Sequence, residues 1–286
     1  MNKICAIFQK RMSLSFEVFP PKQDQPLDHV LNTLERLYTF KPDFCSVTCG
    51  AGGNNRGQNM EICEAIVRSG HTAMAHLTCI GMTKQQMLDT MVQYQHIGVQ
   101  NVLALRGDLP AGWDDTRGDF SYAADLLRTL RESWPDLCIA ATCNPEMHIE
   151  SSSLDRDVMH LRMKIDAGAD FLVTQLFFDN DAFYRYRDRM NAAGIHRPIV
   201  VGVMPVLSPK AIIRMTLSNG VAIPAKLSRI FAKYQDKPEE FQKAGQDFTI
   251  EQIANLISHD IDGLHLYSMN KWERVTEILQ QIGMRR

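Results

Sequence analysis

Short apolar runs alternate with longer amphipathic stretches along most of the chain. The short runs are rich in Val, Ile, Leu, Phe or Thr, and they lack the strict polar alternation of a half-exposed strand. We therefore predict parallel strands that are buried on both faces. The eight predicted strands are Leu14–Phe19, Phe44–Thr48, Ala73–Cys79, Asn101–Leu105, Cys138–Thr142, Phe171–Gln175, Ile199–Met204 and Leu264–Tyr267.

The stretches between these runs have the period of helices. Leu27–Tyr38 repeats apolar residues every three or four positions, which is typical of a helix with one buried face. Asp157–Ala167 is a second example, and Gly168 follows it where a left-handed cap is favoured. The alternation of strands and helices predicts an α/β protein, a single (β/α)8 TIM barrel over residues 1–286. A doubly wound sheet is the alternative fold, because eight βα units do not by themselves require closure.

One stretch departs from this rhythm. From Val221 to about Thr249 (around residues 221–250), the chain is rich in charged residues and contains no predicted strand. We interpret it as a helical excursion inserted before the last strand. No low-complexity linker or fixed-period repeat indicates a second domain.

Composition narrows the functional classes. The 286 residues are 45% hydrophobic and 22% charged, which suits a globular protein with a large core. The net charge of -2 provides no basic surface for nucleic acid or anionic membrane. No apolar stretch approaches the roughly 18 residues that span a bilayer, so we expect a cytoplasmic protein that binds neither nucleic acid nor membrane.

The seven cysteines are scattered through apolar runs, and their odd number disfavours a disulfide framework. Several stand near predicted strand ends together with His76 and His148, an arrangement in which a thiolate zinc site can be imagined. The sequence contains no C-x-x-C or H-E-x-x-H motif, so we expect no metal. The cysteines considered for this site are Cys45, Cys49, Cys79 and Cys143.

Polar residues at the carboxyl ends of barrel strands converge on one face, where the active sites of such barrels lie. Glu17 occurs in Phe-Glu-Val-Phe-Pro-Pro, and apolar neighbours disfavour its charged form, which suits a general acid. In the alternative interpretation, the Glu17 side chain points outward from the strand. Asp108 follows Arg106 and Gly107 at another strand end, and it can tune a cofactor or only cap the next turn.

A glycine-rich turn, Thr48–Gly53, follows the second strand and can present backbone N–H groups to a phosphate. It matches neither of the common nucleotide motifs, so alone it is a weak signal. Arg106 and Lys164 can supply positive charge to the same phosphate. Lysines on helices are more often only solvated.

Taken in order, the motifs resemble the methylenetetrahydrofolate reductases over residues 14–275. The resemblance implies a barrel that binds FAD, takes electrons from NADH or NADPH or from another donor, and reduces 5,10-methylenetetrahydrofolate to 5-methyltetrahydrofolate. The matching segments are Phe16–Pro21, Ser46–Gly53, His76–Cys79, Ala104–Pro110, Pro145–His148, Lys164–Ala169, Thr174–Asp179 and Leu266–Asn270.

The resemblance also implies roles for single residues. Glu17 would be the general acid that helps to open the imidazolidine ring, and Asp108 would lie near the flavin and contact the pterin of the folate. Hydride transfer requires the two in contact. The other substrate-binding residues implied are Gln175, Tyr267 and Lys271. The cofactor-binding residues implied are Thr48, Cys49, Ala51, His76, Arg106, Gly107, Asp108, Tyr122, Asn144, His148, Asp157 and Lys164.

Five positions depart from the family pattern. Cys49 and Asn144 stand where tyrosines are common, and Ala211 and Met215 stand where a glutamine and a phenylalanine are common. Lys271 replaces a common arginine, which exchanges a planar fork for a point charge. These departures leave open a flavin-free relative that acts within a larger complex, and the cysteines and histidines leave open a metal-dependent one-carbon transferase. A second copy of the chain or an electron-transfer protein remains open as a partner.

Overall fold

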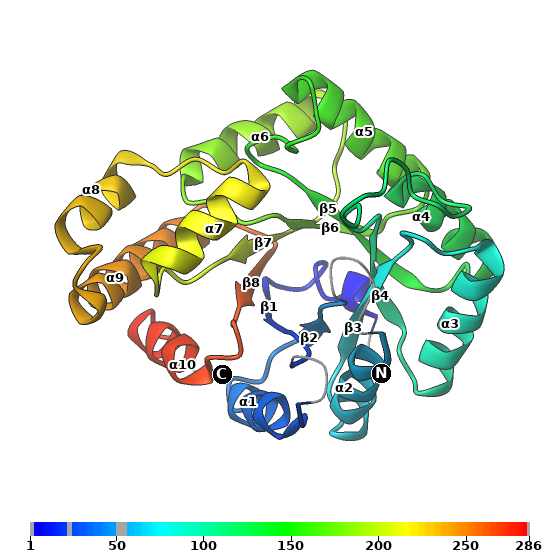
Figure 1. Cartoon of the computed structure of the whole chain (residues 1–286), viewed down its shortest axis with the longest axis horizontal. Helices are drawn as coiled ribbons and strands as arrows, with labels where there is room; N and C mark the ends of the chain where they lie inside the picture. Colours follow the sequence, from blue (N-terminus) through cyan, green and yellow to red (C-terminus); the bar gives the residue numbers. More distant parts are fainter. Residues whose placement is uncertain (1–2, 22–24, 50–55, 285–286) are drawn as a thin grey trace.

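β1 (Ser13–Val18) pairs in parallel with both β2 (Phe44–Val47) and β8 (Gly263–Tyr267), so the sheet closes on itself. The computed structural model describes residues 3–21, 25–49 and 56–284, and Figure 1 looks into the ring of strands with the helices outside it. Closure confirms the (β/α)8 barrel and excludes the doubly wound sheet. The other strands are β3 (Ala73–Thr78), β4 (Asn101–Leu105), β5 (Cys138–Cys143), β6 (Phe171–Thr174) and β7 (Ile199–Val203).

The helices form where the apolar stripes predict them. α5 (Leu154–Asp166) begins three residues before its predicted start because the Ser153 side chain accepts a hydrogen bond from Arg156 N and caps the first turn. Gly168 adopts φ 111° just after this helix, as expected for its cap. The other helices that cover the first six strands are α1 (Asp28–Tyr38), α2 (Arg56–Arg68), α3 (Lys84–His96), α4 (Ala123–Ser133) and α6 (Asn180–Ala192).

Side chains on each strand alternate between the helices and the inside of the barrel. On β1, Leu14, Phe16 and Val18 join the large core beneath the helices. Ser15 and Glu17 therefore point inward. The amino end of the barrel is filled by apolar side chains, and the short helix η1 (Ile4–Ala6) packs against them from below.

The charged stretch after β7 is helical, as predicted, but its boundaries differ. Gly220, with φ 66°, ends α7 (Pro209–Asn219), and α8 (Ala225–Tyr234) follows it. α9 (Pro238–Ile257) continues eight residues beyond the predicted end because its later turns bury Ile253 and Leu256 in the barrel core. These helices pack together on one side of the ring (Figure 1).

α10 (Trp272–Gln281) completes the ring and packs against α1 and α9. The seam between the first and last strands is thus covered by helices from both ends of the chain. Within the described ranges, no helix has both the length and the apolar character needed to cross a membrane.

Candidate active site

Glu17 lies inside the barrel, one residue before the end of β1, and its carboxylate faces two histidines. Oε2 is 3.5 Å from Nε2 of His76 on β3 and 3.6 Å from Nε2 of His265 on β8. The glutamate side chain is 18% exposed, whereas both histidines are buried. This geometry excludes the alternative in which Glu17 points outward.

The buried His76 ring faces the Glu17 carboxylate and lies close enough to His265 to be influenced by its charge. Desolvation lowers the pKa of His76, and the nearby Glu17 opposes that effect while His265 adds to it. Among the described residues, Nε2 of His76 makes no hydrogen bond. A neutral imidazole with a spare polar atom therefore stands beside the acid.

His265 is held in one orientation by two serines. Ser15 Oγ lies 2.8 Å from Nδ1 of His265 and 3.3 Å from the carbonyl oxygen of Leu264. Nε2 of the same ring lies 3.3 Å from Ser46 Oγ and 3.6 Å from Oε2 of Glu17. The arrangement can hold one proton between a carboxyl group and an imidazole.

Sequence analysis missed His265, although a signal was present. His265 is two residues before Tyr267, which was predicted to bind substrate, and residues two apart on a strand share a face. The serines gave no such signal, because a small polar residue inside a barrel carries no pattern of its own.

Tyr267 and Gln175 lie at the same end of the barrel. The Tyr267 hydroxyl donates to the carbonyl of Thr174 at 2.6 Å, and its ring meets His265 edge to face. Burial raises the pKa of Tyr267 well above its ordinary value, and the charge of Glu17 adds to this rise, so the hydroxyl is neutral. Gln175 accepts at Oε1 from the N–H of Leu176 at 2.8 Å.

The loop after β8 fastens the end of β1. Asn270 bonds both backbone groups of Phe19, through Oδ1 at 3.2 Å and Nδ2 at 2.8 Å. Ser268 Oγ donates to the carbonyl of Glu17 itself. These bonds fix the backbone at the carbonyl of the acid and at Phe19, two residues after it, and sequence reasoning did not find them.

A second set of predicted residues is joined through a loop residue that was not predicted. Arg106, after β4, donates from both terminal nitrogens to Glu150, at 2.7 and 2.8 Å. This bidentate bond is the first cause of the lowered pKa of Glu150. His148 Nδ1 accepts from the Glu150 N–H, and Asp157 accepts from the His148 N–H.

Lys164 is not the solvated surface lysine that its helix suggested. Its Nζ donates to the carbonyl of Thr142 on β5 at 2.6 Å. Burial lowers the pKa of Lys164, while the nearby Cys143 and Asp157 oppose that shift. The positive charge predicted for an anion therefore lies beneath the rim, next to the buried Asp157.

The loop after β2 is described only at its start. Thr48 donates its N–H to Val18, and Cys49 is buried, with Sγ 3.7 Å from the Thr78 hydroxyl that donates to it. Ala51 lies outside the described residues. Asn144, after β5, is half-buried.

Three predicted residues lie farther out. Asp108, Tyr122 and Lys271 are exposed, and Tyr122 is 64% exposed at the start of α4. Gly107, between Arg106 and Asp108, has φ 89°, a conformation that favours glycine. The charge of Asp108 still acts on Arg106, since it raises the pKa of that guanidinium after the larger effects involving Glu150 and burial.

Ala211 and Met215 lie one helical turn apart on α7. Both are half-buried against an apolar cluster, which also receives Tyr267 and Met269. The departures from the family pattern at these two positions therefore leave an apolar wall beside Tyr267.

The rim cysteines do not gather into a metal site. Over the described ranges, the one group of three or more closely spaced His, Cys, Asp or Glu ligand atoms is Cys5, Cys138 and Asp170, at the amino end of the barrel. The carboxyl end instead presents an acid between two imidazoles, with Arg106 in the loop after β4 and Lys164 reaching toward β5 from α5. This set suits proton transfer to a bound organic substrate and recognition of an anionic group.

Comparison with known proteins gives concordant results. The family model described as Methylenetetrahydrofolate reductase matches residues 1–283. The 5,10-methylenetetrahydrofolate reductases of Pectobacterium carotovorum subsp. carotovorum and Escherichia coli (strain K12) are 34% and 33% identical over 286 residues, which is 100% of this chain and 95% of each relative. Methylenetetrahydrofolate reductase (NADH) 1 of Arabidopsis thaliana is 35% identical and covers 96% of this chain, which matches 49% of that protein.

Among solved structures, a protein of Clostridium thermocellum is similar with a TM-score of 0.67. It is described as uncharacterized and as binding two copies of 5-methyl-5,6,7,8-tetrahydrofolic acid. The match covers 99% of this chain and 98% of the Clostridium thermocellum chain, at 14% sequence identity. At that identity the likeness supports the barrel fold alone.

Proposed function

The chain belongs to the methylenetetrahydrofolate reductase family, and from this membership we propose that it reduces 5,10-methylenetetrahydrofolate to 5-methyltetrahydrofolate with FAD as its resident cofactor. The observation that carries the proposal is the Glu17 carboxylate between His76 and His265. An acid in that position supplies what the reaction needs from the protein.

The residues present fit a flavin nucleotide. His76 is buried with a polar atom that no described residue satisfies, as expected of a group that faces a ligand. Arg106 provides a half-buried cation at the mouth, and the positive φ of Gly107 lets the backbone approach a ligand closely. When bound, the flavin would supply the hydride.

We assign the other cofactor-binding roles to Thr48, Cys49, Ala51, Asp108, Tyr122, Asn144, His148, Asp157 and Lys164, as the family resemblance implies. Asp157 supports Lys164 in this role, because its carboxylate opposes the lowering of the Lys164 pKa that burial causes. The outer residues would contribute to binding without taking part in proton transfer.

Glu17 acts as the general acid in this proposal. The substrate carries its one-carbon unit between two nitrogens of a five-membered ring, and the ring opens when one nitrogen takes a proton. Desolvation keeps His76 neutral, so no full positive charge on that ring competes for the carboxyl proton. His265 Nε2 lies where it can share the proton with Glu17.

Asp108, Gln175, Tyr267 and Lys271 are the proposed substrate-binding residues besides Glu17. The Tyr267 hydroxyl is bonded to Thr174, so its ring, more than its hydroxyl, is available as a contact surface. The apolar wall of Ala211 and Met215 suits a flat ring system next to it.

The electron donor and the partners form the remainder of the proposal. We infer a nicotinamide nucleotide as the donor, and the Arabidopsis relative named for NADH makes NADH the first to test. A second copy of the chain or an electron-transfer protein stays a prediction, as does a cytoplasmic location.

The test begins with the visible spectrum of the purified protein, in which we expect oxidised flavin. Under anaerobic conditions NADH should bleach the flavin, and 5,10-methylenetetrahydrofolate should restore its colour with formation of 5-methyltetrahydrofolate, measured by mass spectrometry. Stoichiometric zinc with no flavin absorbance would favour the metal-dependent alternative. Bound folate without turnover by any donor would favour the flavin-free one.

Glu17→Gln separates the two half-reactions. The variant should be bleached by NADH at the normal rate, whereas the folate half-reaction should slow by roughly 10²- to 10⁴-fold, because only the proton donor is lost. Glu240→Gln, an exposed carboxylate on α9, is the matched control. Normal folate reduction by Glu17→Gln would refute the assignment.

A further inference from the structure

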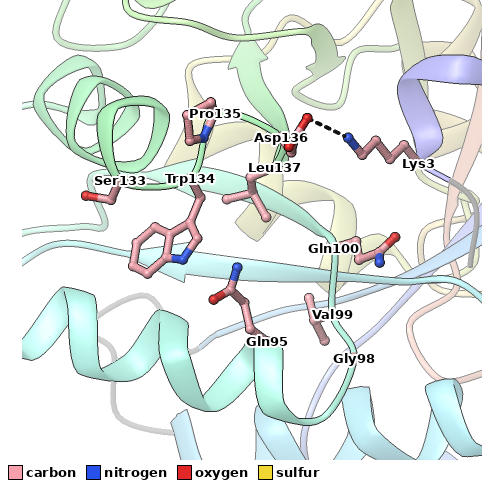
Figure 2. Close-up of a pocket in the computed structure, with 10 residues that line it drawn as sticks. All are labelled: Lys3, Gln95, Gly98, Val99, Gln100, Ser133, Trp134, Pro135, Asp136 and Leu137. Carbon is pink, nitrogen blue, oxygen red and sulfur yellow. Dashed lines mark hydrogen bonds and ion pairs between the residues drawn. The ribbon is translucent and has the colours of Figure 1, made fainter.

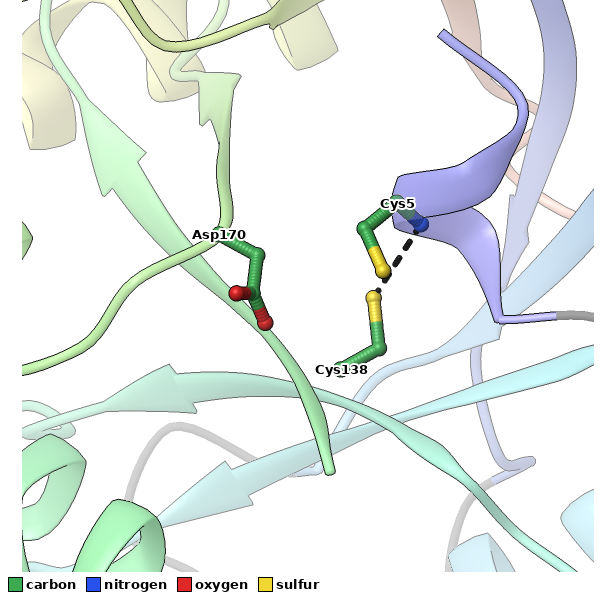
Figure 3. Close-up of side chains that lie close together, drawn as sticks. All are labelled: Cys5, Cys138 and Asp170. Carbon is green, nitrogen blue, oxygen red and sulfur yellow. Dashed lines mark hydrogen bonds between the residues drawn. The ribbon is translucent and has the colours of Figure 1, made fainter. Parts of the chain in front are cut away.

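Two cysteines from distant parts of the sequence meet at the amino end of the barrel, opposite the candidate active site. Figure 3 shows the sulfur atoms of Cys5, on η1, and Cys138, the first residue of β5, directed toward one another, with Asp170 beside them. The two sulfurs and a carboxylate oxygen of Asp170 all lie within 4.8 Å of one another. The N–H of Cys5 also donates to Cys138 Sγ at 3.2 Å.

Both cysteines are held by rigid backbone. The N–H of Ile4 donates to Asn101 Oδ1 at 2.9 Å, and Ile4 is fully buried in the cluster that fills this end of the barrel. The N–H of Cys138 donates to the carbonyl of Gln100. The approach of the two sulfurs is thus fixed by the fold and does not depend on a flexible tail.

The two thiols differ in accessibility and acidity. Cys5 is half-exposed, whereas the other six cysteines are buried. The hydrogen bond from Cys138 lowers the pKa of Cys5 to about 7, with a smaller contribution from Lys3, while burial and Asp170 oppose the shift. The same bond and burial raise the pKa of Cys138. An accessible thiolate therefore stands against a protonated thiol, as in a reactive cysteine with its resolving partner.

We propose that Cys5 and Cys138 form a redox-active thiol pair that a hydroperoxide converts to a disulfide, fastening the N-terminal segment to β5. The thiolate of Cys5 attacks the outer oxygen of the hydroperoxide, the O–O bond breaks, and Cys5 becomes a sulfenic acid while the alcohol or water leaves with a proton from solvent. Cys138 sulfur then attacks the sulfenic sulfur, the S–O bond breaks, and water leaves with the thiol proton. Two thiols are oxidised and one hydroperoxide is reduced.

A surface hollow of about 410 Å³ lies beside this pair in sequence and space. Figure 2 shows Lys3 and Asp136 at its edge, joined by an ion pair of 3.4 Å, and Leu137 below them. Lys3 is two residues before Cys5, and Leu137 immediately precedes Cys138. Cys5 does not line this hollow, but it is itself half-exposed, which gives a molecule as small as hydrogen peroxide a route to it.

Asp170 argues for a disulfide in preference to a metal. Its Oδ2 accepts from Arg131 Nη2 and from the N–H of Ile139, both at 2.8 Å. The carboxylate charge is already neutralised by a guanidinium, which weakens Asp170 as a metal ligand. Two cysteines alone would leave a thiophilic metal with too few protein ligands.

The experiment treats the full-length protein with hydrogen peroxide and then alkylates it under denaturing conditions. We expect two of the seven thiols to be protected, a mass decrease of about 2 Da before alkylation, and a peptide linking Cys5 to Cys138. The melting temperature should rise by on the order of 5 °C and return after dithiothreitol, because the new bond closes a long loop of the unfolded chain.

Two variants and one control make the result specific. Cys5→Ser should abolish the linkage, and Cys138→Ser, which keeps a hydrogen-bond donor beside Cys5 but no attacking sulfur, should leave a sulfenic acid on Cys5 that dimedone traps. Cys63→Ala, at a fully buried cysteine on α2, should form the linkage normally. Seven free thiols after treatment, a linkage between two chains, or stoichiometric zinc that Cys5→Ser removes would each overturn the proposal.

Discussion

Replacing Gly202 on β7 with alanine should disturb the candidate site through a single methyl group. A Cβ at this position would lie 2.4 Å from the Tyr267 hydroxyl oxygen and 2.8 Å from the Thr174 carbonyl oxygen. Both distances are shorter than any normal contact, and the carbonyl belongs to a neighbouring strand that cannot move freely. Tyr267 would have to leave its hydrogen bond with Thr174.

The expected cost follows from these contacts. Overpacking of a buried site costs about 1–3 kcal/mol, and loss of a buried hydrogen bond adds about 1 kcal/mol. We therefore expect Gly202→Ala to lower the free energy of unfolding by about 2–4 kcal/mol, measured by urea denaturation. The slope of that free energy against urea concentration should stay the same as in the wild type. Displacement of Tyr267 should also raise the KM for folate.

A matched control and a second variant test the reasoning. Gly57→Ala, on the exposed side of α2, places its Cβ where no atom lies within 4 Å, so its stability should change by less than about 1 kcal/mol. Tyr267→Phe removes the closest atom, so the alanine should cost less in that background. Wild-type stability of Gly202→Ala, or an equal cost in both backgrounds, would refute the steric account.

Two further predictions concern charge. Desolvation lowers the pKa of His76, so below about pH 6.5 the unfolded chain takes up a proton that the folded chain resists, and the free energy of unfolding should fall. Urea titrations at several pH values should show a smaller fall in His76→Gln than in the wild type. The exposed control His160→Gln should show the full fall. Glu150→Gln should free Arg106 from its ion pair and so tighten the binding of ADP, a probe for the pyrophosphate group, by roughly threefold or more in calorimetry. The exposed control Glu132→Gln should leave ADP binding unchanged. Weaker ADP binding by Glu150→Gln would mean that Glu150 positions the arginine.

Much of the fold could be predicted because the strands are buried on both faces and leave a strong local signal. The differences lie at strand ends, where Thr48, Cys79 and Gln175 fall just outside the sheet as the chain turns away. Closure could not be derived from the pattern. It depends on β1 meeting β8, and local periodicity contains no information about that pairing.

The candidate site was predictable where a residue's position on its strand determined its direction. Glu17 near a strand end is such a case. Glu150 is not, because it lies on a loop and its bond to Arg106 depends on how two loops approach each other. The contact of Lys164 could not be predicted for a related reason: helical periodicity indicates which face is buried, but not that a long side chain reaches back to a strand carbonyl.

The pairing of β1 with β8 has a consequence for how the protein folds during its synthesis. Ser15 and His265, which touch across it, are 250 positions apart. A nascent chain on the ribosome therefore carries the acid of the site long before it carries the imidazole that flanks it. Catalytic competence would arrive in one late step with the final βα unit, and a chain stalled before that point would hold an open sheet with two unpaired edges.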